Sequence, residues 1–99
     1  MNPAFSAGSR VRLTKLEESR PGPLQVGYWL EGMLFDTPTI GYPVEVARDN
    51  RAPQESGEPD AVERFGMFLS SNAEEILEQG DRLVVKTRNS TWEIVPIVS

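Results

Sequence analysis

The chain has 99 residues and a formal net charge of −5 at pH 7, and it contains neither cysteine nor histidine. This length fits one domain over residues 1–99, because a chain of this size has no room for a second independent core. Its composition excludes a disulfide framework, a structural zinc site and any catalytic triad that uses histidine as its base, and we expect no cofactor or metal.

No stretch of the chain has the composition of a secretory leader or a membrane span. The first residues lack an apolar core of signal-peptide length, and nowhere do apolar residues approach the roughly 20 in a row that a membrane helix needs. We therefore expect a cytoplasmic protein without a membrane partner. In that setting, Asn89-Ser90-Thr91 is interpreted as part of a turn and not as a glycosylation acceptor.

The first half of the chain alternates apolar and polar residues in the manner of half-buried β-strands. Residues 10–15 alternate strictly, with Val11 and Leu13 on one face. After a turn rich in proline at residues 19–23, residues 24–35 predict a longer strand. Both of its faces carry large apolar residues: Val26, Tyr28, Leu30 and Leu34 against Trp29, Met33 and Phe35. Gly27 and Gly32 interrupt this strand, which indicates a bulge or a close backbone approach.

The middle of the chain is less regular. A turn at residues 36–43 and a short strand, Val44 to Arg48, come first. Residues 49–64 are acidic and almost free of apolar side chains, so we predict a flexible loop there, either a tolerated insertion or a binding loop. Residues 65–71 return to strand composition. Residues 72–79 fit either a short helix begun by a capping box at Ser71 and Glu74, or one arm of a hairpin around Gly80.

The end of the chain predicts a hairpin. Residues 83–87 and 92–95 alternate, and the short segment 88–91 between them contains Asn89, a residue that suits tight turns. Trp92 is then a core partner for Val85 or Thr87. Taken together, the elements predict a mainly antiparallel β-barrel or roll of five to six strands, with at most one short helix near residues 72–79.

Several predicted strands are apolar on both faces, whereas a small barrel has only one interior. The outer apolar surface is expected to be covered by a partner, because monomers rarely expose large apolar patches. Our leading hypothesis is a non-catalytic protein-interaction module, such as a small accessory or inhibitor protein of a bacterium or its phage. It would bind a protein partner, either a different protein or a second copy of itself, through four residues: Trp29, Met33, Phe35 and Tyr42.

Two alternatives use charged residues instead. A barrel that binds nucleic acid would use a basic strand face, and the outward candidates are Arg10, Arg12, Lys86 and Arg88. The net charge of −5 counts against this function. A small hydrolase would need two carboxylates about 5 to 10 Å apart across a cleft, for which the sequence offers Glu31 with Asp36, or Glu74 with Glu75. Adjacent acidic residues are more often a solvated face.

Overall fold

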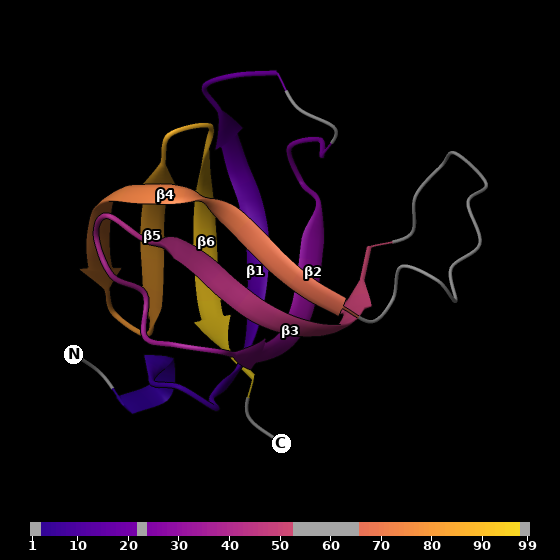
Figure 1. Ribbon diagram of the computed structural model, residues 1–99, viewed down its shortest axis with the longest axis vertical. Coiled ribbons are helices and arrows are strands. Elements are labelled where there is room, and N and C mark those ends of the chain that lie inside the picture. Colours follow the sequence, from indigo (N-terminus) through magenta and orange to yellow (C-terminus); the bar gives the residue numbers. More distant parts are fainter. Residues whose placement is uncertain (1–2, 22–23, 53–65, 98–99) are drawn as a thin grey trace.

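The computed structural model describes residues 3–21, 24–52 and 66–97, and this part of the chain is all-β. Its strands are β1 (Arg10–Glu18), β2 (Trp29–Leu34), β3 (Pro43–Arg51), β4 (Gly66–Gln79), β5 (Arg82–Thr87) and β6 (Ser90–Pro96), and a 3-10 turn, η1 (Pro3–Phe5), precedes them. Each strand pairs antiparallel with the next, and β6 pairs with β1 to close a barrel. Figure 1 shows β3 and β4 crossing in front of β1 and β6. The predicted small antiparallel barrel is confirmed.

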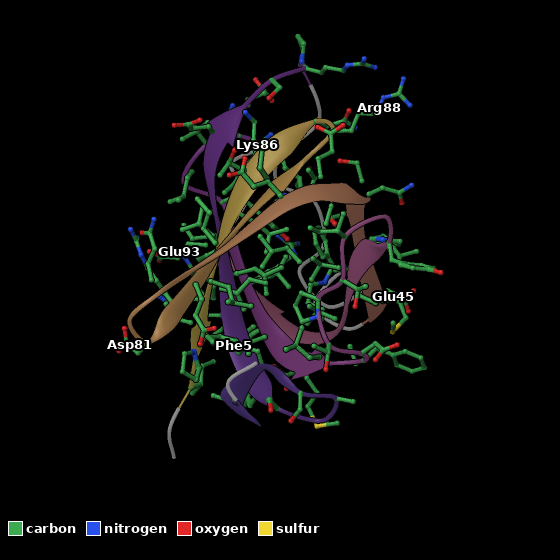
Figure 2. All side chains as sticks on the ribbon, turned by 90° about the vertical axis from the view of Figure 1, so that its left-hand side faces the viewer. Phe5, Glu45, Asp81, Lys86, Arg88 and Glu93 are labelled. Carbon is green, nitrogen blue, oxygen red and sulfur yellow. The ribbon has the colours of Figure 1, made fainter. Side chains whose placement is uncertain are left out.

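The interior is filled by the residues that strand alternation places on one face. Leu13 of β1, Leu30 of β2 and Val46 of β3 are fully buried, as are Leu83, Val85 and Ile94 on β5 and β6. Trp92 lies opposite Val85, and its ring meets that of Phe68 edge-on at a centroid distance of 5.1 Å, so the core assignment of Trp92 is confirmed. One core residue comes from outside the strands: Phe5 of η1 is fully buried toward one end of the barrel (Figure 2).

Gly32 permits a very close approach between β2 and β3. A Cβ atom at this position would lie 2.1 Å from the carbonyl oxygen of Ala47, so no side chain fits there. The register shifts between Glu31 and Gly32, which marks a β-bulge. The predicted role of a strand glycine is therefore confirmed at Gly32. Gly27, by contrast, lies before β2 in a turn, with a positive φ of 93°.

β4 is the longest strand, and it has two different neighbours. Its first half pairs with β3, from Gly66 opposite Arg48 to Asn72 opposite Pro43. Its second half pairs with β5, from Ala73 to Gln79. Residues 72–79 therefore form a strand and not the short helix that the capping-box pattern allowed. Cross-strand pairing over the whole segment outweighs that local signal, and Gly80, with a positive φ of 64°, turns the chain into β5.

Several predicted strand boundaries are wrong, and the strand predicted over residues 10–15 continues to Glu18. The strand predicted over residues 24–35 is shorter, because β2 spans only Trp29–Leu34 and Val26 is exposed outside it. The strand predicted to end at Arg48 continues to Arg51, so the acidic loop does not begin at Asp49. Pairing with β2 orders this extension, since Arg51 lies opposite Leu30 and Asn50 opposite Glu31. The rest of the predicted loop, from residue 53 onward, lies outside the described residues.

The predicted hairpin of β5 and β6 is confirmed, and a buried hydroxyl holds its turn. The Thr87 Oγ1 atom donates to the Ser90 carbonyl at 2.9 Å and accepts from the Ser90 N–H at 3.1 Å. It also accepts from the Ser71 hydroxyl at 2.7 Å, and the Ser71 Oγ atom accepts from the Asn89 N–H at 3.1 Å. These bonds fix the hairpin turn to the middle of β4.

Replacing Thr87 tests this network. Thr87→Val keeps the shape of the side chain but leaves the Ser90 N–H without its hydroxyl acceptor, so we expect a loss of about 1–3 kcal/mol in the free energy of unfolding. Thr87→Ser keeps the hydroxyl and removes only a methyl group, so it is the matched control and should cost less. Urea denaturation of the two variants gives the comparison. A valine variant more stable than the serine variant would contradict the role assigned to the hydroxyl.

Candidate functional site

The outer face of β2, β3 and β4 carries a contiguous group of apolar side chains. The register places Met33 of β2, Ala47 of β3 and Met67 of β4 in one row across the three strands. In the next row, the Phe35 N–H donates to the Glu45 carbonyl, and Glu45 lies opposite Leu69. We call the four large residues of these rows, Met33, Phe35, Met67 and Leu69, the apolar band.

The apolar band points away from the core. The residues that alternate with it, Leu34, Val46 and Phe68, are all buried. Phe35 is 65% exposed, Leu69 58%, and Met33 and Met67 50% each. At about half exposure each, four side chains of this size present roughly 400 Å² of apolar surface, which is in the range of the largest patches found on monomers.

The four residues predicted to bind a partner occupy three different environments. Met33 and Phe35 belong to the apolar band. Tyr42 is 66% exposed in the connection between β2 and β3, where Ile40 is exposed as well. Trp29 is not part of the band: it is half-buried opposite Thr14, and the Arg12 guanidinium lies 4.4 Å from its ring centroid. This cation–π contact already occupies one face of the indole.

Met67 and Leu69 were not among the predicted binding residues. The sequence pattern indicates that the two share a face, but it does not say which face is outward, because Phe68 between them is also large and apolar. They are identified by lying across β3 from Met33 and Phe35, and this can be seen only once the strand order and the register are known.

Glu45 is the charged residue at the centre of the apolar band. It lies on β3 between Phe35 and Leu69 and is half-buried by its neighbours. Figure 2 shows it on the opposite side of the barrel from Glu93. Glu93 is paired with Arg82, at 2.5 Å between Oε2 and Nη1. The band is therefore an apolar surface with a carboxylate inside it, which matters for the kind of partner that can cover it.

The basic residues proposed as a nucleic-acid face do not form one stripe. Arg10 makes a two-point contact with Asp49 on β3, and Arg12 Nη2 lies 2.9 Å from Glu31 Oε2. Their charges are thus matched by neighbouring carboxylates. On β6, the residues opposite Arg12 and Lys86 are four positions apart, roughly 13 Å along a strand. Figure 2 shows Lys86 and Arg88 toward the end of the barrel that is far from Phe5.

The carboxylates nominated for hydrolysis are engaged elsewhere or exposed. Burial alone raises the pKa of Glu31, but hydrogen bonds from Asn50, at 3.0 Å, and from Arg12, at 2.9 Å, outweigh it and leave the pKa below its ordinary value. A general acid needs the opposite shift. Asp36 is exposed and accepts the Thr37 N–H at 2.9 Å, while Glu74 and Glu75 are exposed on β4.

Residues 3–21, 24–52 and 66–97 contain no group of three or more Asp, Glu, His or Cys residues placed to hold a metal ion. Within the same ranges, no helix is both long and apolar enough to cross a membrane.

The ion pairs of β1 with β2 and β3 predict how stability depends on pH. The hydrogen bond from Arg10 lowers the pKa of Asp49, as those from Asn50 and Arg12 lower that of Glu31. A carboxyl whose pKa is lowered in the folded state stabilises the fold at pH values above its ordinary pKa. This stabilisation is lost as the pH falls through the folded-state pKa. We expect the melting temperature to fall between about pH 5 and pH 3, and to fall less steeply in a Glu31→Gln, Asp49→Asn variant.

Glu78→Gln, which removes an exposed carboxyl from the second half of β4, is the control and should leave the steep slope in place. Circular dichroism at each pH gives the melting temperatures. Parallel curves for the double variant and the unchanged protein would show that the two ion pairs do not stabilise the fold.

The chain was also compared with known proteins. No protein-family model, no curated protein and no solved structure matches it. A function is therefore inferred from the residues themselves, and foremost from the apolar band on β2, β3 and β4.

Proposed function

We propose that this chain is a non-catalytic protein-interaction module, and that the apolar band is its binding surface. The observation that supports the proposal is the exposure of Met33, Phe35, Met67 and Leu69 side by side on three paired strands. These strands are held in register by pairing with β3, so they present the side chains without a large ordering cost on binding. The proposed location is the cytoplasm. The absence of cysteine supports it, because small secreted domains often depend on disulfides and cytosolic proteins rarely do.

The composition of the band suits a protein surface better than a small molecule. Methionine is flexible and polarisable, so Met33 and Met67 can adapt to an irregular partner. Phe35 offers a rigid aromatic anchor of the kind that dominates binding energy at interfaces. Ile40 and Tyr42, in the connection between β2 and β3, are exposed apolar side chains as well. A surface of this kind is typical of a binding face and not of a catalytic cleft.

Glu45 suggests which partners fit. A partner that covers the band also covers this carboxylate, so it should place a lysine or arginine opposite Glu45 to avoid leaving a buried, unpaired charge. Self-association stays a prediction. A symmetric pair of copies would bring two Glu45 carboxylates close together, and it would bury only about 800 Å² in total, less than most stable interfaces. We therefore favour a different protein with a basic residue at the centre of its apolar patch.

Photo-crosslinking tests the band directly. With p-benzoylphenylalanine in place of Met67, irradiation of living cells of the source organism should yield a discrete adduct of higher mass. The same group in place of Leu77, an exposed apolar residue on the second half of β4, is the matched control and should yield little. Adding Phe35→Glu to the Met67 probe should suppress the adduct, because an unpaired carboxylate would be buried at the interface.

An equal yield at both positions would overturn the proposal, because a partner bound to the band cannot reach Leu77 on the far half of β4. Circular dichroism of each variant confirms that it is folded before the yields are compared.

Self-association is tested separately by sedimentation velocity. We expect a monomer at low micromolar concentration and only a weak dimer at tens of micromolar, strengthened by salt, which screens the repulsion between Glu45 carboxylates. Glu45→Gln should tighten this dimer by about tenfold, and Phe35→Glu should abolish it. If Glu45→Gln has no effect while a dimer persists, the copies associate through another face of the barrel.

A further inference from the structure

The first half of β4 has an edge that no other strand covers within the described residues. This half pairs with β3 on one side, whereas β5 pairs only with the second half, from Ala73 onward. The carbonyl of Glu45 accepts from Phe35 on the β2 side of β3, so Glu45 and Leu69 form a pair without mutual hydrogen bonds. The backbone N–H and C=O of Leu69 therefore point away from β3, toward the open edge.

A cavity of about 200 Å³ lies along this open edge. Residues 68–71 of β4 form one side, and the other sides come from the start of the β1–β2 connection and from the turn between β5 and β6. Phe68 and Trp92, the edge-to-face pair of the core, both line it, so its floor is aromatic. Pockets for drug-sized ligands are about 300–1,000 Å³, so this cavity suits one apolar side chain.

Two cationic side chains line the same cavity, although the protein as a whole is acidic. Lys15 falls in the inward phase of β1 and is only 3% exposed. Its ammonium lies 2.9 Å from Glu18 Oε1 and 2.5 Å from the Leu24 carbonyl, which accounts for two of its three N–H donors. Arg20 is exposed at the rim, held near the β5–β6 turn by the bond from its N–H to the Asn89 carbonyl at 3.2 Å. Since Glu18 offsets the charge of Lys15, Arg20 supplies most of the positive charge that a ligand would meet.

We infer that the cavity and the open edge of β4 beside it, together called the groove, bind the C-terminal residue of an extended polypeptide. The peptide backbone pairs with Leu69 on the open edge of β4, its last side chain enters the cavity above Phe68 and Trp92, and its terminal carboxylate faces Arg20 and the third N–H of Lys15. Each part of a C-terminal residue has a feature of the groove that can bind it. The strand edge pairs with its backbone, the aromatic floor contacts its side chain, and the cations attract its carboxylate. The inference rests on the proposed function, because it specifies the chemistry of the protein partner, and Leu69 belongs to both the groove and the apolar band.

Peptide titrations test the groove. The probes are acetylated tetrapeptides, Ser-Thr-Val followed by Ala, Val, Leu or Phe, each with a free carboxylate or as its C-terminal amide, together with N-acetyl-leucine. The protein carries Trp29→Phe, so that tryptophan fluorescence reports only on Trp92 in the cavity floor. We expect at least one free-acid peptide to change this fluorescence saturably, its amide to bind about tenfold more weakly, and N-acetyl-leucine to bind more weakly than the matching tetrapeptide.

Two variants locate the binding. Arg20→Gln should remove most of the difference between acid and amide, whereas Arg82→Gln, which lies on β5 in an ion pair with Glu93, should leave it unchanged. In the unchanged protein, hydrogen exchange of the Leu69 amide should slow when the bound peptide accepts its N–H. A folded Arg20→Gln variant that still prefers the acid by the full factor would overturn the assignment of the carboxylate site.

Two results of the peptide titrations would overturn the inference. One is that none of the four free-acid peptides changes the fluorescence saturably at millimolar concentration, and the other is that acids and amides bind equally well. Binding of N-acetyl-leucine as tightly as the tetrapeptide would also overturn it, because a small acid would then be the ligand and the strand edge would play no part. Failure here together with a Met67-specific crosslink would leave the proposed function standing, since that test does not involve the groove.

Discussion

The division of β4 between two neighbours is the constraint on which the rest of the structure depends. Only a long, strongly curved strand can pair with β3 along one half and with β5 along the other, and this sharing turns a meander of hairpins into a closed barrel. The half that pairs with β3 brings Met67 and Leu69 beside Met33 and Phe35. The same half keeps one edge free beside the cavity. Both candidate binding surfaces are therefore consequences of how the barrel closes.

The charged residues that border the apolar band are paired with one another. At one end of β1, Arg10 and Arg12 are matched by Asp49 and Glu31, and Arg10 lies directly opposite Met33. The apolar band is thus bordered by paired charges, which cost less to bring near a partner than unpaired ones. Arg20, for which the described residues offer no ion-pair partner, lies near the other end of β1, beside the cavity. This separation gives the two ends of the barrel different chemistry.

Alternation along the strands predicted which residues face the core, as Leu83, Val85 and Ile94 show, because a period of two follows from strand geometry alone. It could not predict where strands end: β3 continues through Asp49 to Arg51 because β2 offers partners there. Met33 and Phe35 were found by their outward phase, but Trp29 shares that phase and is stacked under Arg12. The sequence could not show that Arg10 and Arg12 are paired either, since their carboxylate partners come from neighbouring strands whose register the sequence alone does not reveal.

The seam between β1 and β6 has a mechanical consequence. These strands are antiparallel neighbours, so the start of β1 lies beside the end of β6, as Val11 opposite Pro96 shows, and both termini leave the barrel at the same end in Figure 1. A force that pulls the two termini apart would act across the seam, in line with its hydrogen bonds, and would break them one pair at a time. Strands loaded in shear break many bonds together and resist more. Once Phe5 is drawn out of the core, the barrel should unzip at low force.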